Sequence, residues 1–392
     1  MEDKKVDHCS TPPSYLPQMG KCTKSLNRDP LALEDDDEAS ANGTFKHALA
    51  RAIIAQEHGL PFDNEDFSSA TSEDEEQVRV VQDFVNFYIA RLRKRYAVVE
   101  IFLEERVELN DYLPNPAWGY ADIVLVAHRK KPNKDGIYND STIVVLDEKY
   151  GRVEVPVYTK DGPNFQLSAY WAGLYERFKD KYEITRGVIG IIQPVIKNYP
   201  TFQFRTKFMT DFVRNVISPI AYEAYEDRGS YNPSPSNCLY CKNKIHCKHN
   251  IAQLIAFNQL ADKPDMLDDS IIEDLILPYA SSLKKHCDAI LNYCLKRAEE
   301  GKTWKGFALS TGRPTRVYTD ESEAKRIALD NGYKDFVVES ILSPAQAEKL
   351  LGKTAFKELL GSLVTYKPGK NTLVPEAEAK GTSKNFINQE NK

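Results

Sequence analysis

The sequence predicts an α/β fold in which helices flank a mixed central sheet, and three observations carry this prediction. Unbroken apolar runs at Ile123–Ala127 and Ile143–Leu146 indicate strands that are covered on both faces. Apolar residues recur at helical spacing from Val78 to Tyr96, which predicts an amphipathic helix. Across this part of the chain the order is helix, strands, helix, strand and helix, which is typical of an α/β core.

The N-terminal part leads into this core. Residues 1–42 contain Pro12-Pro13 and an acidic run at Glu34–Glu38, so we expect this segment to be poorly ordered in places. A helix is predicted from Thr44 to Glu57. The acidic, serine-rich residues 62–77 are predicted to form a loop before the amphipathic helix.

The strands follow. Val98–Leu109 is predicted to be the first strand, and its alternation breaks at Glu104-Glu105, where the strand bends or reaches a site. The polar residues 129–141 connect the two apolar runs as a turn. Gly187–Gln193 is predicted to be a further strand, and Phe208–Tyr225 a helix.

The C-terminal part is predicted to be mainly helical. We expect a helix over 251–260, a long one over 271–297 broken at Pro278, a short hairpin over 302–320, helices over 321–331 and 344–351, and a disordered end from Lys367. Cys287 and Cys294 are seven residues apart in the helical pattern and are expected to be buried.

Composition limits the class of protein. The 392 residues suffice for two or three domains, and 42% hydrophobic with 28% charged residues is ordinary for a globular protein. No apolar run approaches the roughly 18 residues that span a bilayer, and the N-terminus has no apolar export core. We therefore expect a cytoplasmic protein with no membrane partner. The net charge of −5 argues against a globally basic nucleic-acid binder and leaves room for a local basic groove.

Charged residues stand at the ends of the two apolar strands. Asp122 precedes the first run, and Asp147 and Lys149 follow the second on one face, with Glu148 on the other. The two aspartates can meet at one edge of the sheet, where a divalent cation would relieve their repulsion. Oxygen ligands with positions left for water and phosphate suit Mg²⁺ or Mn²⁺.

Further polar residues extend this site. Lys149 would orient a water molecule or neutralise charge on a phosphorane-like transition state. Gln166 and Tyr170 are four residues apart on a predicted helix and therefore share one face. Such a set of groups is suited to hydrolysis of a phosphodiester.

The motifs G-x-x-D (Gly119, Asp122), D-x-K (Asp147, Lys149) and Q-x-x-x-Y (Gln166, Tyr170) together resemble the PD-(D/E)XK nucleases, and within them the RecB-like exonucleases. This branch also carries a histidine on an N-terminal helix, in a G-x-x-x-H setting. The resemblance implies that His47, Asp122 and Asp147 are metal ligands, that Lys149 is the catalytic lysine, and that Gln166 and Tyr170 support them. One more acid is common on the preceding strand, and Glu105 and Glu108 both fit loosely.

Three cysteines lie close together in the second half of the chain. Cys238, Cys241 and Cys247 form a C-x2-C-x5-C cluster that needs a fourth ligand. In a reducing compartment disulfides are a weak explanation. His246 or His249 would complete a zinc site, whereas a distant cysteine, Cys22 or Cys9, is the alternative.

Iron–sulfur members of the RecB-like branch place one cysteine before the nuclease motifs and three after them. The layout here is the same, with Cys22 first and Cys238, Cys241 and Cys247 last. The resemblance implies a structural [4Fe–4S] cluster, with zinc as the alternative, and Cys22 is preferred to Cys9 because it lies closer to the His47 helix.

The strings LSPAQAEKLLGK, FKELLGSLV and KPGKNTLVPE resemble an uncharacterised family of phage and prophage proteins with the same nuclease motifs. Arg313, Arg316, Lys325 and Arg326 could grip a DNA backbone, and a solvated packing module is an equal alternative. We expect six segments, namely an N-terminal segment with a cluster cysteine (1–42), a RecB-like nuclease core (43–237), the cysteine cluster (238–250), a helical extension (251–300), a small C-terminal module (301–366) and a largely disordered tail (367–392).

Together these observations predict a Mg²⁺- or Mn²⁺-dependent deoxyribonuclease, and the resemblance makes it an exonuclease acting on DNA ends in phage recombination or replication. The alternative is an inactive iron–sulfur or zinc protein that keeps the nuclease fold and binds DNA or serves as a scaffold. The expected partner is DNA. A phage single-strand annealing protein is a conceivable second partner, although no stretch of the sequence points to one.

Overall fold

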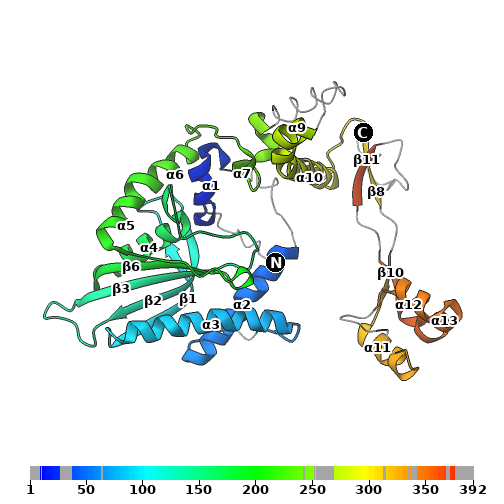
Figure 1. The fold of residues 1–392 in the computed structure, drawn as a ribbon, viewed down its shortest axis with the longest axis horizontal. Coiled ribbons are helices and arrows are strands. Elements are labelled where there is room, and N and C mark those ends of the chain that lie inside the picture. Colours follow the sequence, from blue (N-terminus) through cyan, green and yellow to red (C-terminus); the bar gives the residue numbers. More distant parts are fainter. Residues whose placement is uncertain are drawn as a thin grey trace, which may run out of the picture. The chain divides into compact units, whose positions relative to one another are not determined.

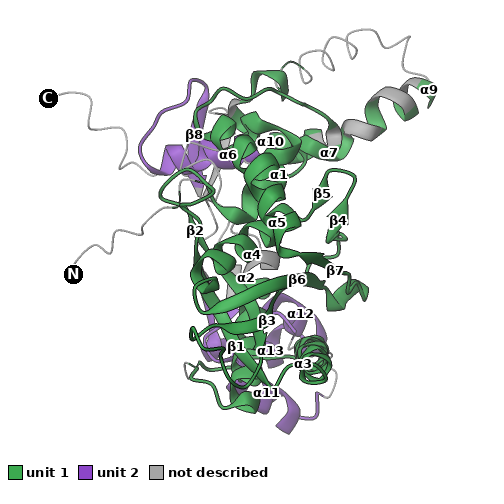
Figure 2. Cartoon of the chain, turned by 90° about the vertical axis from the view of Figure 1, so that its left-hand side faces the viewer, with its two compact units in different colours: residues 1–286 green, residues 287–392 purple. Residues whose placement is uncertain are grey.

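The protein is represented by a computed structural model, which divides into two compact units, residues 1–286 and 287–392 (Figure 2). The structure describes residues 9, 11–26, 38–62, 65–241, 243–250, 252, 269–311, 315–333, 336, 342–367 and 371–375. Most of the predicted helix over 251–260, most of the acidic run at 34–38 and the last residues of the predicted tail lie outside this described part.

The first unit is built on a five-stranded mixed sheet (Figure 1). Its strands lie in the order β1, β2, β3, β6 and β7, and only β3 and β6 are parallel. A helix therefore has to connect β3 to β6, as parallel strands require. The strands span Val98–Glu108 (β1), Trp118–His128 (β2), Tyr138–Glu148 (β3), Tyr182–Ile192 (β6) and Thr201–Arg205 (β7).

Helices cover both faces of this sheet, which confirms the α/β prediction (Figure 1). On one face α2 (Glu38–His58) and α3 (Ser72–Arg93) pack on the alternate residues Val144 and Leu146. On the other, α4 (Phe165–Phe178) packs on Ile143 and Val145. β3 is buried on both sides, which explains its unbroken apolar run.

Shorter elements complete the first unit. The helices and helical turns are η1 (Pro13–Tyr15), α1 (Leu16–Lys21), η2 (Thr23–Ser25), η3 (Pro194–Ile196), α5 (Thr206–Phe212), η4 (Val213–Ile217), α6 (Ser218–Tyr225), α7 (Pro235–Cys238), η5 (Lys244–His246), α9 (Asp269–Ile271) and η7 (Ile272–Ile276). A small hairpin consists of β4 (Tyr158–Thr159) and β5 (Gly162–Pro163). The long helix α10 (Leu277–Glu299) begins next to Pro278, where the sequence predicted a break.

Several elements differ from the prediction. Helix α2 begins at Glu38 rather than Thr44, and strand β6 begins at Tyr182 rather than Gly187. Helix α3 begins at Ser72 rather than Val78, because Thr71 and Asp74 form a capping box that starts the helix within the predicted loop. Strand β3 begins at Tyr138, inside the predicted turn. The predicted helix over 208–225 contains a π-helical turn, η4, where the Ser218 hydroxyl donates to the Val213 carbonyl over 3.0 Å.

In the second unit, each of the first two strands pairs with a strand near the C-terminal end of the unit. Strand β8 (Phe307–Thr311) pairs with β11 (Asn371–Pro375), and β9 (Thr315–Tyr318) pairs with β10 (Val364–Lys367). The predicted hairpin over 302–320 is therefore wrong, because β8 and β9 pair with strands nearer the C-terminus and not with each other. The predicted disorder from Lys367 is also wrong for residues 371–375, which form β11. The core contains Phe336, Phe356 and Leu360, with α11 (Glu321–Asp330), α12 (Pro344–Leu351) and α13 (Lys353–Leu360) around it.

The structure also tests the expectations for two cysteines and for one of the candidate DNA-binding arginines. Cys287 is exposed and Cys294 half-buried, so the predicted burial of both is wrong. Arg326 pairs with Glu323 and Asp330 at 2.6 and 3.0 Å, so acids of its own helix neutralise this candidate DNA contact. Within the described residues, no helix is both long and apolar enough to cross a membrane.

Candidate metal centre

Two strands and one helix bring acids and a histidine to one end of the sheet. Ile123 pairs with Leu146, so the next residues along the two antiparallel strands, Asp122 and Asp147, lie side by side. Helix α2 supplies His47, whose Nδ1 lies 3.6 Å from Asp122 Oδ2. The structure thus brings together the three residues for which a metal-ligand role was expected.

Glu148 belongs to the same site, although the sequence analysis gave it no role. Its Oε2 lies 3.9 Å from His47 Nδ1, and its backbone N–H donates to Asp122 Oδ2 over 2.8 Å. The Tyr150 hydroxyl donates to Glu148 Oε2 over 2.7 Å and fixes the carboxylate. The available signal was a second acid between Asp147 and Lys149 at the end of a buried strand.

The acid from the first strand is Glu104. Ligand atoms of Glu104, His47 and Asp122 all lie within 4.8 Å of one another. Glu104 has a left-handed backbone with φ of +50°, which is rare for a non-glycine residue and turns its side chain out of the strand's alternation. Neither acid proposed from the sequence takes this position, because Glu105 pairs with Arg177 and Glu108 with Arg106.

Lys149 holds a positive charge next to these carboxylates. Its Nζ lies 2.5 Å from Asp147 Oδ2, and the two residues emerge on the same side of the strand end. The Lys149 side chain is 32% exposed and that of Asp147 only 4%, so the lysine is the more accessible member of the pair. This arrangement can present a cation to an anionic substrate without losing its counter-ion.

Burial and mutual repulsion oppose ionisation of the carboxyl groups. Burial, followed by the charge of Asp147, raises the pKa of Asp122 to about 8. Burial and the charge of Asp122 raise the pKa of Glu148 well above its usual value. Burial lowers the pKa of His47, whereas the neighbouring carboxylates raise that of Lys149 despite its burial. Without a cation, these acids cannot all be charged at neutral pH.

A divalent cation fits this donor set. A histidine nitrogen and carboxylate oxygens that converge within 4.8 Å can coordinate a metal ion. The predominance of oxygen favours hard ions such as Mg²⁺ and Mn²⁺. The residues that would hold the ion are His47, Glu104 and Asp122, with Asp147 and Glu148 beside them.

The predicted supporting pair lies on the neighbouring helix. Tyr170 of α4 is buried, Gln166 hydrogen-bonds to it, and the charges of Asp147 and Asp122 help to raise its pKa. Gly119 explains how Tyr170 reaches this place, because a Cβ at Gly119 would lie 2.8 Å from the Tyr170 hydroxyl oxygen. The glycine of the G-x-x-D motif therefore makes room for the tyrosine of the Q-x-x-x-Y motif.

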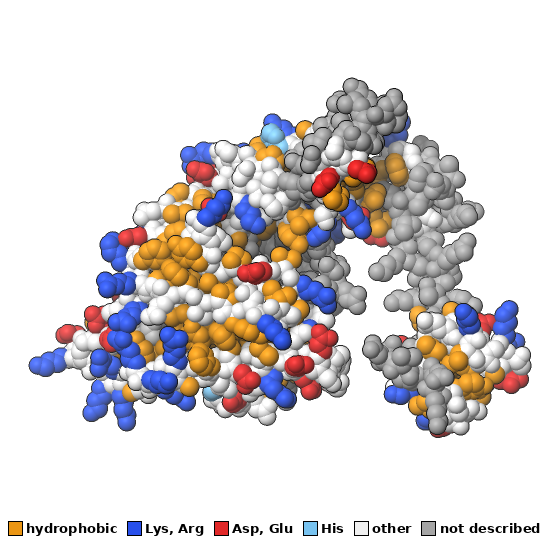
Figure 3. Space-filling model, viewed as in Figure 1, with side chains coloured by type: hydrophobic (Ala, Val, Ile, Leu, Met, Phe, Trp, Pro, Cys, Tyr) orange, Lys and Arg blue, Asp and Glu red, His pale blue; other side chains and the backbone are white. Residues whose placement is uncertain are grey.

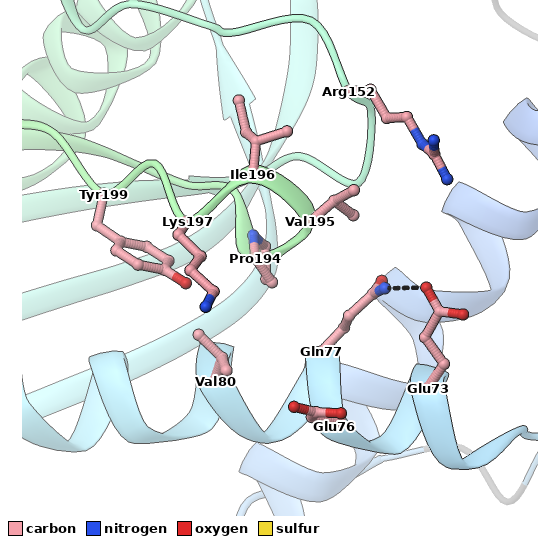
Figure 4. Close-up of a pocket in the computed structure, with 10 residues that line it drawn as sticks. All are labelled: Glu73, Glu76, Gln77, Val80, Arg152, Pro194, Val195, Ile196, Lys197 and Tyr199. Atoms are coloured by element: carbon pink, nitrogen blue, oxygen red, sulfur yellow. Dashed lines mark hydrogen bonds between the residues drawn. The ribbon is translucent and has the colours of Figure 1, made fainter.

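A hollow of about 660 Å³ lies between α3 and the turn that precedes β7 (Figure 4). Gln77 lines it and accepts a hydrogen bond from Lys46, the neighbour of His47, over 2.9 Å. Arg152 and Lys197 line its other walls (Figure 4). The hydrogen bond between Lys46 and Gln77 therefore links the wall of this hollow to the helix that carries His47.

The N-terminal segment carrying Cys22 lies against the stretch that leads to the cysteine cluster. Asn232 donates its backbone N–H to Cys22 Sγ over 3.4 Å, and Gln18 donates to the Asn237 carbonyl over 2.6 Å. The Cys22 thiolate influences the pKa values of Cys238 and Cys241, both of which burial raises, that of Cys241 to about 11. Cys22 therefore lies near the three C-terminal cysteines in the fold, although about two hundred residues separate it from them in the sequence.

The other candidate ligands are placed differently. Cys9 accepts the Trp118 backbone N–H over 3.4 Å and affects the pKa of Tyr170, so it lies beside the metal centre instead. The ring of His249 packs on Tyr231, 4.3 Å between centroids. All seven cysteines are free, and within the described part no three cysteine sulfurs lie within 4.8 Å of one another.

Comparison with known proteins gives one extensive match. The family described as "Protein of unknown function (DUF2800)" matches residues 12–381. No curated protein matches the chain. Among solved structures, the one described as "Crystal structure of SSO0001" is similar at a TM-score of 0.23 and 14% sequence identity, covering 51% of this chain and 95% of that one.

Proposed function

We propose that this chain, which belongs to the DUF2800 family of proteins of unknown function, is a metal-dependent deoxyribonuclease with a PD-(D/E)XK core. The observation that carries the proposal is the convergence of His47, Glu104, Asp122 and Glu148 beside the Asp147–Lys149 pair. The resemblance of the sequence motifs to RecB-like exonucleases supports DNA as substrate and DNA ends as the place of attack.

The residues of the site divide the chemical tasks among them. A bound Mg²⁺ or Mn²⁺ supplies a Lewis acid and lowers the pKa of water. His47, Glu104 and Asp122 would hold that ion. Lys149 remains protonated, because the carboxylates around it raise its pKa, and it stabilises negative charge that develops on a phosphate.

The neighbouring residues hold the charged groups in position. Tyr150 fixes the Glu148 carboxylate through its hydroxyl, and Asp147 fixes the Lys149 ammonium. Tyr170 packs against Gly119 and thereby sets how closely the Asp122 strand approaches α4, and Gln166 hydrogen-bonds to Tyr170. Preorganisation of this kind raises the rate because no reorganisation is needed in the transition state.

A second metal centre is proposed at Cys22, Cys238, Cys241 and Cys247, and it is structural. The resemblance to iron–sulfur members of the RecB-like branch favours a [4Fe–4S] cluster, which four thiolates suit, and a zinc ion is the alternative.

The nuclease proposal is tested with end-labelled linear DNA and covalently closed circular DNA, using anaerobically purified protein with Mg²⁺ or Mn²⁺. Digestion of the linear DNA alone, abolished by EDTA and by Lys149→Ala, is the expected result. Lys349→Ala, which removes an exposed lysine from α12, is the matched control and should remain active. Cutting of circles would make the enzyme an endonuclease, and intact, metal-loaded protein without activity on either DNA would overturn the proposal.

A further inference from the structure

Two arginines face each other at the edge of the sheet. Arg186 on β6 pairs directly with Arg205 on β7, so both side chains project from the same face. Both are exposed, and within the described part of the chain neither forms an ion pair. Like charges directly opposite each other destabilise a sheet, so this pair is unfavourable unless an anion lies between them.

Two hollows meet at these arginines. One of about 580 Å³ is lined by both arginines, Gln203 and three phenylalanines, and one of about 200 Å³ lies between α3 and the same strands. Arg186 and Gln203 line both of them. No aspartate or glutamate is among the residues that line either hollow, in contrast to the hollow of Figure 4, which is lined by Glu73 and Glu76.

Aromatic rings extend the larger hollow toward solvent. Phe208 is 44% exposed and Tyr158 is 50% exposed. The Phe202 ring lies between them, with its centroid 4.8 Å from that of Tyr158 and 5.9 Å from that of Phe208. Exposed aromatic faces next to arginines are the combination on which single-stranded nucleic acids stack their bases.

The surroundings are basic although the whole chain has a net charge of −5. Helix α3 ends nearby with Arg91 and Arg93, and Lys94 and Arg95 follow it. Arg91 and Arg95 line the smaller hollow, where Arg95 also pairs with Asp140 at 2.8 Å. The space-filling view shows lysine and arginine side chains gathered over this end of the sheet (Figure 3). Such a concentration of positive charge attracts a polyanion.

We propose that this edge, formed by Arg186, Arg205, Phe202 and Phe208, binds a single strand of DNA and delivers it to the metal centre. This inference rests on the proposed nuclease function and identifies the form of its substrate. The arginines contact phosphates and the phenylalanines stack on bases. A duplex fits less well, because its bases are already stacked on one another and present no free faces.

The position of the edge suits this role. Arg186 lies five residues before Ile191, which pairs with Asp147, so strand β6 separates the arginine from the centre by about 17 Å. Strand β7 runs along this edge from Arg205 back to Thr201, which pairs with Gly190, the neighbour of Ile191. A strand bound at the arginines can therefore reach the candidate ligands by following one edge of the sheet.

The test measures binding separately from hydrolysis. In the Lys149→Ala background, fluorescence anisotropy with a labelled oligo(dT) of about 16 nucleotides, the upper site size for one binding groove, reports affinity without digestion. Arg186→Ala/Arg205→Ala should weaken binding at least tenfold. Lys349→Ala/Lys357→Ala, which removes the same charge from the second unit, should bind like the parent.

Two further readouts identify the kind of contact. The slope of log affinity against log salt should fall by about 1.4 in the double arginine variant, since each phosphate contact on a single strand contributes about 0.7. Phe208→Ala should weaken oligo(dT) binding. The double arginine variant should melt at the parental temperature or above it, because both side chains are exposed and their removal relieves a repulsion.

Unchanged affinity and salt slope in the double arginine variant would overturn the inference, as would tighter binding of a duplex that does not depend on Phe208. The nuclease assay on the parent protein is scored independently. If the protein does not hydrolyse DNA but its binding depends on the arginines, the proposed nuclease function is wrong and the binding edge is retained. If the protein is active but its binding does not depend on the arginines, the nuclease function is retained and the binding edge is wrong.

Discussion

Gly119 lies against Tyr170 so closely that a Cβ at the glycine would come within 2.8 Å of the tyrosine hydroxyl oxygen. The two residues belong to different motifs of the sequence, one at the start of β2 and one in α4. Their contact shows that the motifs act as a single packing unit, in which the glycine sets how closely the Asp122 strand approaches the helix.

We therefore expect Gly119→Ala to lower the free energy of unfolding by about 1–3 kcal/mol, the usual cost of overpacking. The displaced strand carries Asp122, so hydrolysis should fall more than stability explains. In a Tyr170→Ala background the added methyl group no longer meets the ring, and the extra loss should shrink. Urea unfolding of the four proteins of this cycle measures the coupling, and purely additive effects would contradict it.

Glu104 provides a test of the metal site by a neutral substitution. An ion that binds only the folded protein stabilises it by about 2.7 kcal/mol at a hundredfold excess over its dissociation constant. Mg²⁺ or Mn²⁺ should thus raise the melting temperature of the wild type, and Glu104→Gln should abolish or strongly reduce the increase.

The adjacent Glu105→Gln is the matched control for this substitution. Glu105 pairs with Arg177, whose side chain is 48% exposed, and such a pair contributes about 0–1 kcal/mol. This variant should keep the full response to the metal. A full response in Glu104→Gln together with its loss in Glu105→Gln would mean that the acid from β1 had been identified incorrectly.

The contrast between these two glutamates shows where sequence reasoning ends. The apolar runs of β2 and β3 predicted both strands and put Asp122 and Asp147 at their ends, because burial on two faces is recorded in the local pattern. The break of alternation at Glu104-Glu105 was visible as well. Which side chain turns inward depends on a single left-handed backbone angle at Glu104, and the sequence pattern does not reveal it.

Long-range pairing was equally hidden from local signals. The sequence between β8 and β9 has the composition of a turn, yet the strands pair with β11 and β10, some fifty to sixty residues further on. The N-terminal docking of Cys22 likewise depends on a close contact of Thr23 with Gly229, where a Cβ would lie 2.0 Å from the threonine Oγ1. By contrast, the sequence does contain the signal for the start of α3, because Thr71 and Asp74 have the spacing of a capping box. The prediction of a loop over 62–77 overlooked this signal.

Asp74 ties the start of α3 to the helix that carries His47. Its Oδ1 lies 3.1 Å from Lys46 Nζ, and the two side chains are only 11% and 8% exposed. Asp74→Ala removes one half of the capping box and leaves a buried ammonium without its counter-ion, which costs about 3–5 kcal/mol. Because Lys46 precedes His47, the variant should also weaken the response to metal. Stability within about 0.5 kcal/mol of the wild type at neutral pH would contradict this role.

The same residue predicts a pH dependence. Burial alone would raise the pKa of Asp74, but hydrogen bonds from Thr71 and the Lys46 ammonium outweigh it, and the net pKa is lowered. A carboxyl with a lowered folded pKa stabilises the protein above its unfolded pKa of about 3.9, and this contribution is lost as pH falls through the folded value. The stability difference between wild type and Asp74→Ala should therefore be large at neutral pH and shrink in strong acid, as urea unfolding at a series of pH values would measure.

Cys22 and Cys9 allow the proposed iron–sulfur centre to be tested by two substitutions of the same kind. Cys22 accepts a hydrogen bond from Asn232 in the stretch that leads to Cys238, whereas Cys9 accepts one from Trp118 next to Tyr170. In protein purified anaerobically, Cys22→Ser should lose most of its iron and acid-labile sulfide, and Cys9→Ser should retain both.

The effect on stability separates a structural cluster from an incidental one. A ligand set from Cys22 to Cys247 closes a loop of more than two hundred residues, so its loss releases the N-terminal segment from the end of the core. In Cys22→Ser, the backbone amides of Ser230 and Asn232 should therefore exchange their hydrogens with solvent faster than in the wild type. The amides of β2 and β3 should stay protected. Zinc without iron or sulfide in the wild type would replace the cluster with a zinc site, and loss of the metal in Cys9→Ser alone would assign the fourth ligand to the other cysteine.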